Sequence, residues 1–191
     1  MEIAARKKTL REELLSRRAA LTGDPAARSR RIADNFLRSI PLPAAAIVSA
    51  YVAIGDEADP APLIDGLRAR GHRVALPRVV AKGEPLAFHL YEGGTKLVPG
   101  IFGLSQPDPA WLKVDPDVLA VPLLGFDARG NRIGYGAGFY DRTLTLLRSR
   151  NKVLAVGYAF AGQEVPEVPH RESDEVLDWI VTEERAREVE R

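Results

Sequence analysis

The sequence contains no cysteine among its 191 residues, which excludes disulfides, thiolate nucleophiles and cysteine-ligated zinc. Its formal net charge is only +1, so no overall electrostatic field attracts it to nucleic acid or to anionic lipid. No stretch approaches the ~18 consecutive apolar residues that a membrane-spanning helix needs. The charged N-terminus has no apolar run behind it, so no signal peptide is predicted. These features favour a cytoplasmic protein that binds neither nucleic acid nor membranes.

Several common catalytic motifs are also missing. No Gly-Lys pair occurs, which excludes a Walker A loop. The histidines do not have the HExxH spacing of zinc proteases, and no serine lies in a Gly-x-Ser-x-Gly elbow. Hydrolase chemistry of these types is therefore not indicated.

Apolar patterning predicts helices and strands in alternation. Asp24-Pro25 and Asp59-Pro60 are typical helix starts, and short β-rich apolar runs bounded by proline or glycine are typical of buried strands. Residues 91–116 read as loop-rich, with glycine and proline throughout. The expected helices span 2–21, 24–39, 59–70 and 139–149, and the expected strands span 46–52, 73–76, 86–90, 118–121, 153–158 and 179–182.

Strands alternating with helices indicate βαβ units and a mostly parallel sheet. We therefore predict one α/β domain with a three-layer, Rossmann-like architecture over residues 1–191. Residues 1–40 form an N-terminal helical extension, residues 44–182 form the α/β core, and residues 183–191 form a charged C-terminal helix.

The most informative segment is residues 130–142, in which glycines alternate at positions 134, 136 and 138 ahead of a predicted helix. Glycine-rich backbone leading into a helix N-terminus offers free N–H groups to an anion. A dinucleotide-binding fingerprint is excluded because it requires glycine where this chain has Phe139. A tight turn or close helix packing would also explain the glycines. The flanking charges of Arg132, Asp141 and Arg142 favour a phosphate site.

Other charged residues are candidates for the same site. Lys7 and Arg11 share one face of the first helix, either as anion ligands or as part of a solvated face. Glu57 follows a buried strand, whereas Asp59 is better explained as a helix cap. Carboxylates near the glycine segment and the C-terminus could bind Mg²⁺ together with phosphate oxygens and water. These carboxylates are Asp141, Asp174 and Asp178.

Taken together, these motifs resemble the 5-formyltetrahydrofolate cyclo-ligase family over nearly the whole chain. The resemblance is carried by Lys7-x3-Arg11, Glu57, Phe102-Gly103-Leu104-x2-Pro107, Val121-Pro122-x2-Gly125-Phe126-Asp127, residues 130–142, and Asp174-x3-Asp178-Trp179-Ile180-Val181-Thr182-Glu183. It implies a fold like that of sugar-phosphate isomerases and CoA transferases. It also implies ATP- and Mg²⁺-dependent cyclisation of 5-formyltetrahydrofolate to 5,10-methenyltetrahydrofolate, with ADP and phosphate as further products.

The resemblance assigns roles to individual residues. It implies that Arg132 and Tyr140 are catalytic and that Asp141 and Asp174 bind the metal. Its ATP contacts are Lys7, Arg11, Arg132, Ile133, Gly134, Tyr135, Gly136, Ala137, Gly138, Phe139 and Tyr140. Its folate contacts are Arg11, Val52, Glu57, Tyr135, Gly136, Ala137, Gly138 and Phe139.

Two other functions remain open at this point. A sugar-phosphate isomerase or CoA-transferase-like enzyme could use the glycine segment for a monophosphate, and a non-catalytic nucleotide-binding module could share the fold. We expect a monomer whose Arg132 lies exposed on a loop and contributes little to stability.

Overall fold

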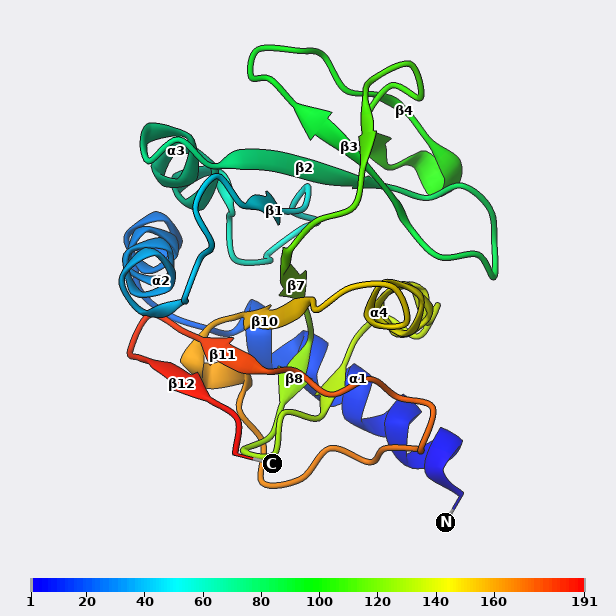
Figure 1. Ribbon diagram of the computed structural model, residues 1–191. Coiled ribbons are helices and arrows are strands. Elements are labelled where there is room, and N and C mark those ends of the chain that lie inside the picture. The colour runs from blue at the N-terminus through cyan, green and yellow to red at the C-terminus, as the bar shows by residue number, and fades with distance from the viewer. Residues whose placement is uncertain (1, 191) are drawn as a thin grey trace.

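A computed structural model describes residues 2–190. Its centre is an eight-stranded sheet in the order β12-β11-β10-β7-β1-β2-β3-β6. The five strands from β11 to β2 are parallel, and the pairings at the two edges are antiparallel. Helices α2 and α3 lie on one side of the sheet and α4 lies on the other (Figure 1). The predicted three-layer, mostly parallel α/β fold is therefore confirmed.

The helices agree with the predicted spans to within two residues at either end. They are α1 (Ile3–Ala19), α2 (Pro25–Ser39), α3 (Ala61–Ala69) and α4 (Phe139–Arg148), with 3-10 turns η1 (Ile101–Gly103) and η2 (Ala161–Gln163). The strands are β1 (Ile47–Ser49), β2 (Arg73–Arg78), β3 (Ala87–Tyr91), β4 (Val98–Pro99), β5 (Ser105–Gln106), β6 (Lys113–Val114), β7 (Val118–Pro122), β8 (Gly125–Phe126), β9 (Arg132–Ile133), β10 (Leu154–Tyr158), β11 (Trp179–Val181) and β12 (Ala186–Glu188).

Local chemistry explains where two of the helices begin. The Asp24 carboxylate accepts a hydrogen bond from the Ala26 amide at the start of α2. Asp59 does the same for the Ala61 amide at the start of α3, which confirms its interpretation as a cap. Capping of this kind satisfies amides that have no partner within the helix.

Each face of the sheet buries its own hydrophobic cluster. On one face, Phe36 of α2 and Leu63 of α3 pack against the sheet. On the other face, Leu144 and Leu147 of α4 pack against β7 and β10. Both faces are covered, which is why the central strands are apolar along their whole length.

The order in which strands are added to the sheet reverses between β1 and β7, which are themselves parallel. From β1 the chain crosses through α3 to β2 on one side, and from β7 it crosses through α4 to β10 on the other. In open α/β sheets the crevice beyond the carboxyl ends of the strands at such a reversal is where ligands bind.

Helix α1 packs outside the three layers, next to the small hairpin of β8 and β9 (Figure 1). Its Leu14 is fully buried in a third cluster with Leu124 and Ile133. This contact places the N-terminal helix beside the glycine segment that follows β9.

One expectation about secondary structure is wrong. Residues 183–190 were expected to be helical, but residues 186–188 form β12, which pairs antiparallel with β11 and closes an edge of the sheet; position 191 lies outside the described residues. Residues 91–116, expected to be loop-rich, contribute the two-residue strands β4, β5 and β6. None of the helices within residues 2–190 is long and apolar enough to cross a membrane.

Candidate active site

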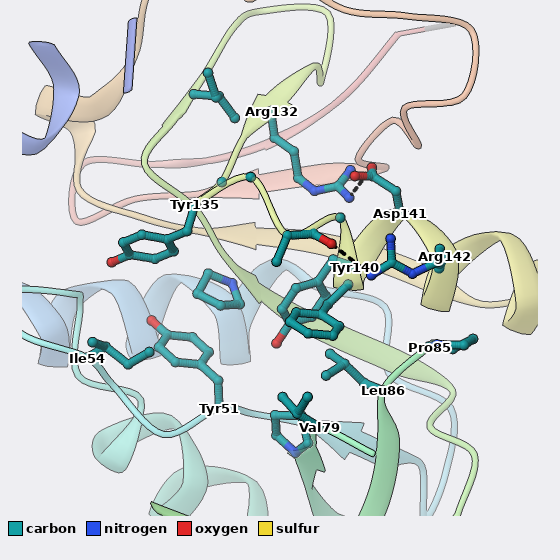
Figure 2. Close-up of a pocket in the computed structure, with 18 of the residues that line it drawn as sticks. Tyr51, Ile54, Val79, Pro85, Leu86, Arg132, Tyr135, Tyr140, Asp141 and Arg142 are labelled. Carbon is teal, nitrogen blue, oxygen red and sulfur yellow. Dashed lines mark hydrogen bonds and ion pairs between the residues drawn. The ribbon is translucent and has the colours of Figure 1, made fainter. Parts of the chain in front are cut away.

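A cavity of about 1490 Å³ opens beyond the carboxyl ends of β1, β2 and β7. Every site residue that the sequence singled out from Lys7 to Asp174 lies on its wall. Figure 2 shows side chains from three different segments converging on it, with Tyr51 and Ile54 facing Tyr135, and Tyr140 near Leu86. The fold thus joins residues that are far apart in the sequence.

The glycine loop, residues 134–138, has two glycines in the left-handed region. Gly136 has φ +100° and Gly138 has φ +68°, a conformation that other residues rarely adopt. Gly138 is also the N-cap of α4. The loop therefore turns its backbone into the helix N-terminus, as the sequence predicted.

Gly134 needs a different explanation. Its φ is not left-handed, and a Cβ added to it would meet no protein atom within 4 Å. It lines the cavity. Neither backbone strain nor protein packing requires glycine here, so the missing side chain leaves open space at this point of the cavity.

Helix α1 supplies two cationic side chains to the cavity. The Arg11 Nε atom donates a hydrogen bond of 2.9 Å to the Gly134 carbonyl. The Lys7 ammonium forms an ion pair with Asp174. Burial raises the pKa of the Asp174 carboxyl, but hydrogen bonds from Lys7 and from the Arg171 amide outweigh it, so the pKa is lowered overall.

Arg132 is not the exposed loop residue that the sequence suggested. It lies on β9, its side chain is only 7% exposed, and its Nη2 atom is 2.6 Å from Oδ1 of Asp141. Its Nη1 atom donates to the Glu175 carbonyl. Figure 2 shows the guanidinium reaching across to Asp141 at the start of α4. Arg132 is therefore held by fixed partners on the wall of the cavity.

Two groups on the cavity wall are strongly affected by burial. Burial raises the pKa of the Glu57 carboxyl, and hydrogen bonds from the Ile54 amide and the Tyr135 hydroxyl only partly oppose that. Burial also raises the pKa of Tyr140, with the charge of Glu57 adding to it. The Tyr140 hydroxyl is buried with no hydrogen-bond partner among residues 2–190. It is a neutral donor that the protein itself does not use.

Two carboxylates on the cavity wall suit a magnesium ion. The Arg132 guanidinium and the Glu175 amide both donate to Oδ1 of Asp141, which leaves Oδ2 for a cation. Asp174 is the second carboxylate, and Mg²⁺ is ordinarily held by one or two carboxylates with phosphate oxygens and water. No cluster of three or more potential metal ligands occurs within residues 2–190. Asp178 accepts bonds from Arg148 and the Ala155 amide and is not on the cavity wall.

Sequence reasoning missed some residues of the cavity. Phe102 lines it with 63% of its surface exposed, in a left-handed conformation, and its ring lies 6.5 Å from that of Phe139. Gln106 also lines it, with a buried Nε2 atom that has no partner in the described chain. Both lie in or beside the Phe102-Gly103-Leu104-x2-Pro107 motif, which was the only available signal.

Residues 3–183 match the model of the 5-formyltetrahydrofolate cyclo-ligase family. The chain belongs to this family. It is 38% identical over 148 residues to the 5-formyltetrahydrofolate cyclo-ligase of Mycolicibacterium smegmatis, covering 72% of this chain and 74% of that protein. It is 35% identical over 173 residues to the Escherichia coli K12 cyclo-ligase, covering 87% and 94%.

Solved structures agree with this assignment. The structure of 5,10-methenyltetrahydrofolate synthetase from Aquifex aeolicus has a TM-score of 0.80 and 28% identity, and the match covers 97% of this chain and 93% of that one. The synthetase from Mycoplasma pneumoniae has a TM-score of 0.71 at 22% identity, which supports the fold alone. This protein is thus an enzyme of the cyclo-ligase family, and the binding roles of its cavity residues remain predictions.

Proposed function

We propose that this cyclo-ligase uses Mg-ATP to close 5-formyltetrahydrofolate to 5,10-methenyltetrahydrofolate, with release of ADP and phosphate. One observation carries the proposal. In a member of this family, a single cavity joins the glycine loop and its cations to Glu57 on a separate segment. Its volume of about 1490 Å³ exceeds what a single small-molecule ligand ordinarily occupies, so a nucleotide and a folate can lie side by side.

The chemistry explains the need for a nucleotide. A formamide carbonyl is a weak electrophile and its oxygen is a poor leaving group. In the proposed reaction the formyl oxygen attacks the γ-phosphorus of ATP, and the bond from that phosphorus to ADP breaks. N10 of the folate then attacks the activated carbon, the new C–N bond forms, N10 loses its proton, and phosphate leaves with the former formyl oxygen.

This reaction asks the protein mainly for positioning and charge neutralisation. Lys7 and Arg11 from α1 and Arg132 from β9 carry positive charge to the glycine loop, where the phosphates would lie. Arg132 is preorganised by its bonds to Asp141 and Glu175. Donors that are fixed before reaction stabilise developing charge without further reorganisation.

Tyr140 fits the role of a neutral hydrogen-bond donor to the reacting groups. Its hydroxyl is buried, has no partner within residues 2–190, and faces the charges of Glu57 and Arg132. Because burial raises its pKa, the hydroxyl keeps its proton at physiological pH. A donor of this kind can bind an oxygen that gains negative charge during phosphoryl transfer.

The wall formed by the segment after β1 suits the folate. Val52 provides apolar surface, and the Glu57 carboxylate accepts N–H donors such as those of a pterin ring. Val79 and Leu86 add apolar surface to the same cavity. The two substrates would then meet above the glycine loop.

Asp141 and Asp174 would hold Mg²⁺ beside the phosphates. When bound, the ion offsets negative charge on the transferring phosphoryl group. Lys7 and Arg132 would hold the two carboxylates in position through their ion pairs.

The direct test is to mix the purified protein with 5-formyltetrahydrofolate and follow the near-ultraviolet absorbance of the methenyl product, with and without Mg-ATP. We expect product only when Mg-ATP is present, with ADP formed in equal amount. Turnover of a phosphosugar or acyl-CoA without nucleotide would instead favour the isomerase-like or transferase-like alternative. Nucleotide binding with no turnover of the folate would favour a non-catalytic module. A monomeric state and a cytoplasmic location remain predictions.

A further inference from the structure

Arg18 is a buried arginine that belongs to none of the roles above. Its side chain is 2% exposed, although it lies on a helix that is otherwise polar and charged. Burying a guanidinium is costly unless it is paired and hydrogen-bonded. The groups that pair with the Arg18 guanidinium offset this cost, and they therefore indicate the role of Arg18.

Those partners link α1 to two walls of the cavity. The Arg18 Nε atom donates to Oδ1 of Asp56 at 2.8 Å, in the segment after β1. The Arg18 Nη2 atom donates to the hydroxyl of Tyr135 at 2.9 Å, in the glycine loop. The guanidinium carbon also lies 5.9 Å from the centre of the Tyr135 ring.

Two arginines of α1 thus donate hydrogen bonds to consecutive residues of the glycine loop. Arg11 donates to the carbonyl of Gly134, and Arg18, two helical turns further along, donates to the side chain of Tyr135. Arg11 lies on the cavity wall, whereas Arg18 lies behind it. Arg18 can therefore affect bound substrate only through the residues that it holds.

The direction of the hydrogen bonds has a chemical consequence. A guanidinium only donates, so the Tyr135 oxygen must accept, and the hydroxyl proton points away from Arg18. The neighbouring acceptor is the Glu57 carboxylate. Burial raises the pKa of this carboxyl, and hydrogen bonds from the Ile54 amide and the Tyr135 hydroxyl, together with the charge of Arg18, only partly oppose that effect. A hydroxyl that accepts from a cation is a stronger donor to an anion.

We propose that Arg18 is a positioning residue for substrate recognition, which directs the Tyr135 hydroxyl proton to Glu57 and so presents an ordered, ionised carboxylate to the N–H donors of the pterin ring. The inference rests on the proposed function, because it assigns Glu57 to the folate. It adds a residue outside the cavity to the recognition of that substrate.

Several charged or titratable groups face Glu57 and bear on its ionisation. They come from α1, from the segment after β1, from the glycine loop and from α4, and they are Arg18, Asp56, Tyr51, Tyr135 and Tyr140. Among these groups Arg18 carries the positive charge. Loss of Arg18 therefore raises the pKa of Glu57 further. As the pH is lowered, the variant should then lose substrate binding at a higher pH than the wild type does.

The test compares Arg18→Met, Arg18→Lys and Tyr135→Phe with Arg17→Met, whose arginine is exposed on the same helix. For each variant we would measure KM for 5-formyltetrahydrofolate and for Mg-ATP across a range of pH. For each variant we would also measure the Kd for 5-formyltetrahydrofolate by calorimetry in the absence of ATP, and the midpoint of thermal unfolding. Arg18→Met should raise the folate KM and Kd about five- to ten-fold, the effect of one ordinary hydrogen bond, because Arg18 acts on the substrate only through other residues. The KM for Mg-ATP should change less than about two-fold.

Two further outcomes are specific to positioning. The pH below which folate binding is lost should be higher in Arg18→Met than in the wild type, and should remain near the wild-type pH in Arg18→Lys, which keeps the charge. In a Tyr135→Phe background, Arg18→Met should produce little additional loss of folate affinity, because the residue that it holds no longer has a hydroxyl. Arg17→Met should match the wild type.

The results that would overturn the inference are distinct from those that would overturn the function. An active wild type whose folate KM and lower pH limit of folate binding do not change in Arg18→Met overturns the assignment of Arg18 alone. Parallel losses of unfolding midpoint, folate affinity and ATP affinity would give Arg18 a merely structural role and overturn it as well. A wild type that neither binds nor converts the folate overturns the proposed function and this inference with it.

Discussion

Arg132 and Asp141 close the glycine loop by an ion pair across its two ends. Nη2 of Arg132 on β9 lies 2.6 Å from Oδ1 of Asp141 in the first turn of α4. The pair joins the two ends of the loop, and Gly138 of the loop is the N-cap of α4. Stability and the proposed phosphate binding are therefore expected to be linked at this position.

Arg132→Ala should impair both properties. It removes a cation from the cavity and breaks a largely buried ion pair together with the bond to Glu175, so we expect a loss of roughly 1–3 kcal/mol of unfolding free energy. The KM for ATP should rise and kcat should fall, by on the order of 10²-fold in kcat/KM. Denaturant unfolding and steady-state kinetics measure the two effects. Arg132→Lys is the matched control and should recover part of both. If the unfolding free energy did not change, Arg132 would contribute little to stability, as the sequence analysis expected.

The proposed magnesium site distinguishes Asp141 and Asp174, which should bind the ion, from Asp178, which should not. Asp141→Asn and Asp174→Asn should each shift the Mg²⁺ titration of activity to higher concentration, because each removes a charged oxygen ligand from the cavity. Calorimetry of ATP binding with and without Mg²⁺ gives an independent readout. Asp178→Asn is the control. It should lower stability, since Asp178 accepts from Arg148 and the Ala155 amide, and leave the Mg²⁺ requirement unchanged. If all three variants gave the wild-type titration, neither Asp141 nor Asp174 would be a ligand.

Gly134→Ala should reduce activity without reducing stability. The added methyl meets open space in the protein, so the unfolding free energy should stay constant or rise by about 0.4–1 kcal/mol. The same methyl would occupy the space where we place a phosphate, so the KM for ATP should rise about ten-fold or more. Gly136→Ala is the contrast, because its φ of +100° predicts a loss of stability. An ATP KM that did not respond to Gly134→Ala would remove the ligand-based reason for that glycine.

Glu57→Gln should raise stability at neutral pH while weakening folate binding. The pKa of Glu57 is raised by burial above its ordinary value of 4.5, so its contribution to stability is fully present below that value and is lost as pH rises through the folded-state pKa. The substituted side chain does not ionise. The variant should therefore be more stable than the wild type only once the pH has risen through the folded-state pKa of Glu57. Thermal unfolding followed from acidic to neutral pH checks the sign. A variant that was equally stable or less stable than the wild type at every pH would contradict it.

The local parts of the fold could be read from the sequence. Asp24-Pro25 places the start of α2 because the cap and the first-turn proline act within a few residues. The apolar run at residues 118–122 predicts a buried strand for the same local reason. The prediction that failed depended on a contact between segments that are separate in the sequence. The charged segment after Thr182 has no strand signal of its own and becomes β12 because it pairs with β11.

The same division holds for the candidate site. The glycine loop was evident because φ angles and helix entry are local properties, and the family resemblance supplied Lys7, Glu57 and Asp174. Arg18 could not be found in this way. In the sequence it is one of two adjacent arginines on a charged helix, and only the packing of α1 shows that Arg18 is buried and Arg17 is exposed.

The bond from Arg11 to the carbonyl of Gly134 also bears on when the enzyme becomes active during its synthesis. Helix α1 is synthesised well before the glycine loop, because 123 positions separate Arg11 from Gly134. Of the α1 side chains, only Leu14 and Arg18 are buried, and their partners lie near or beyond that loop as well as in the segment after β1. Strands β1, β2, β3, β6 and β7 all precede this loop, so much of the sheet can be made before α1 has its docking surface. The wall of the cavity is completed only when α1 packs against the loop.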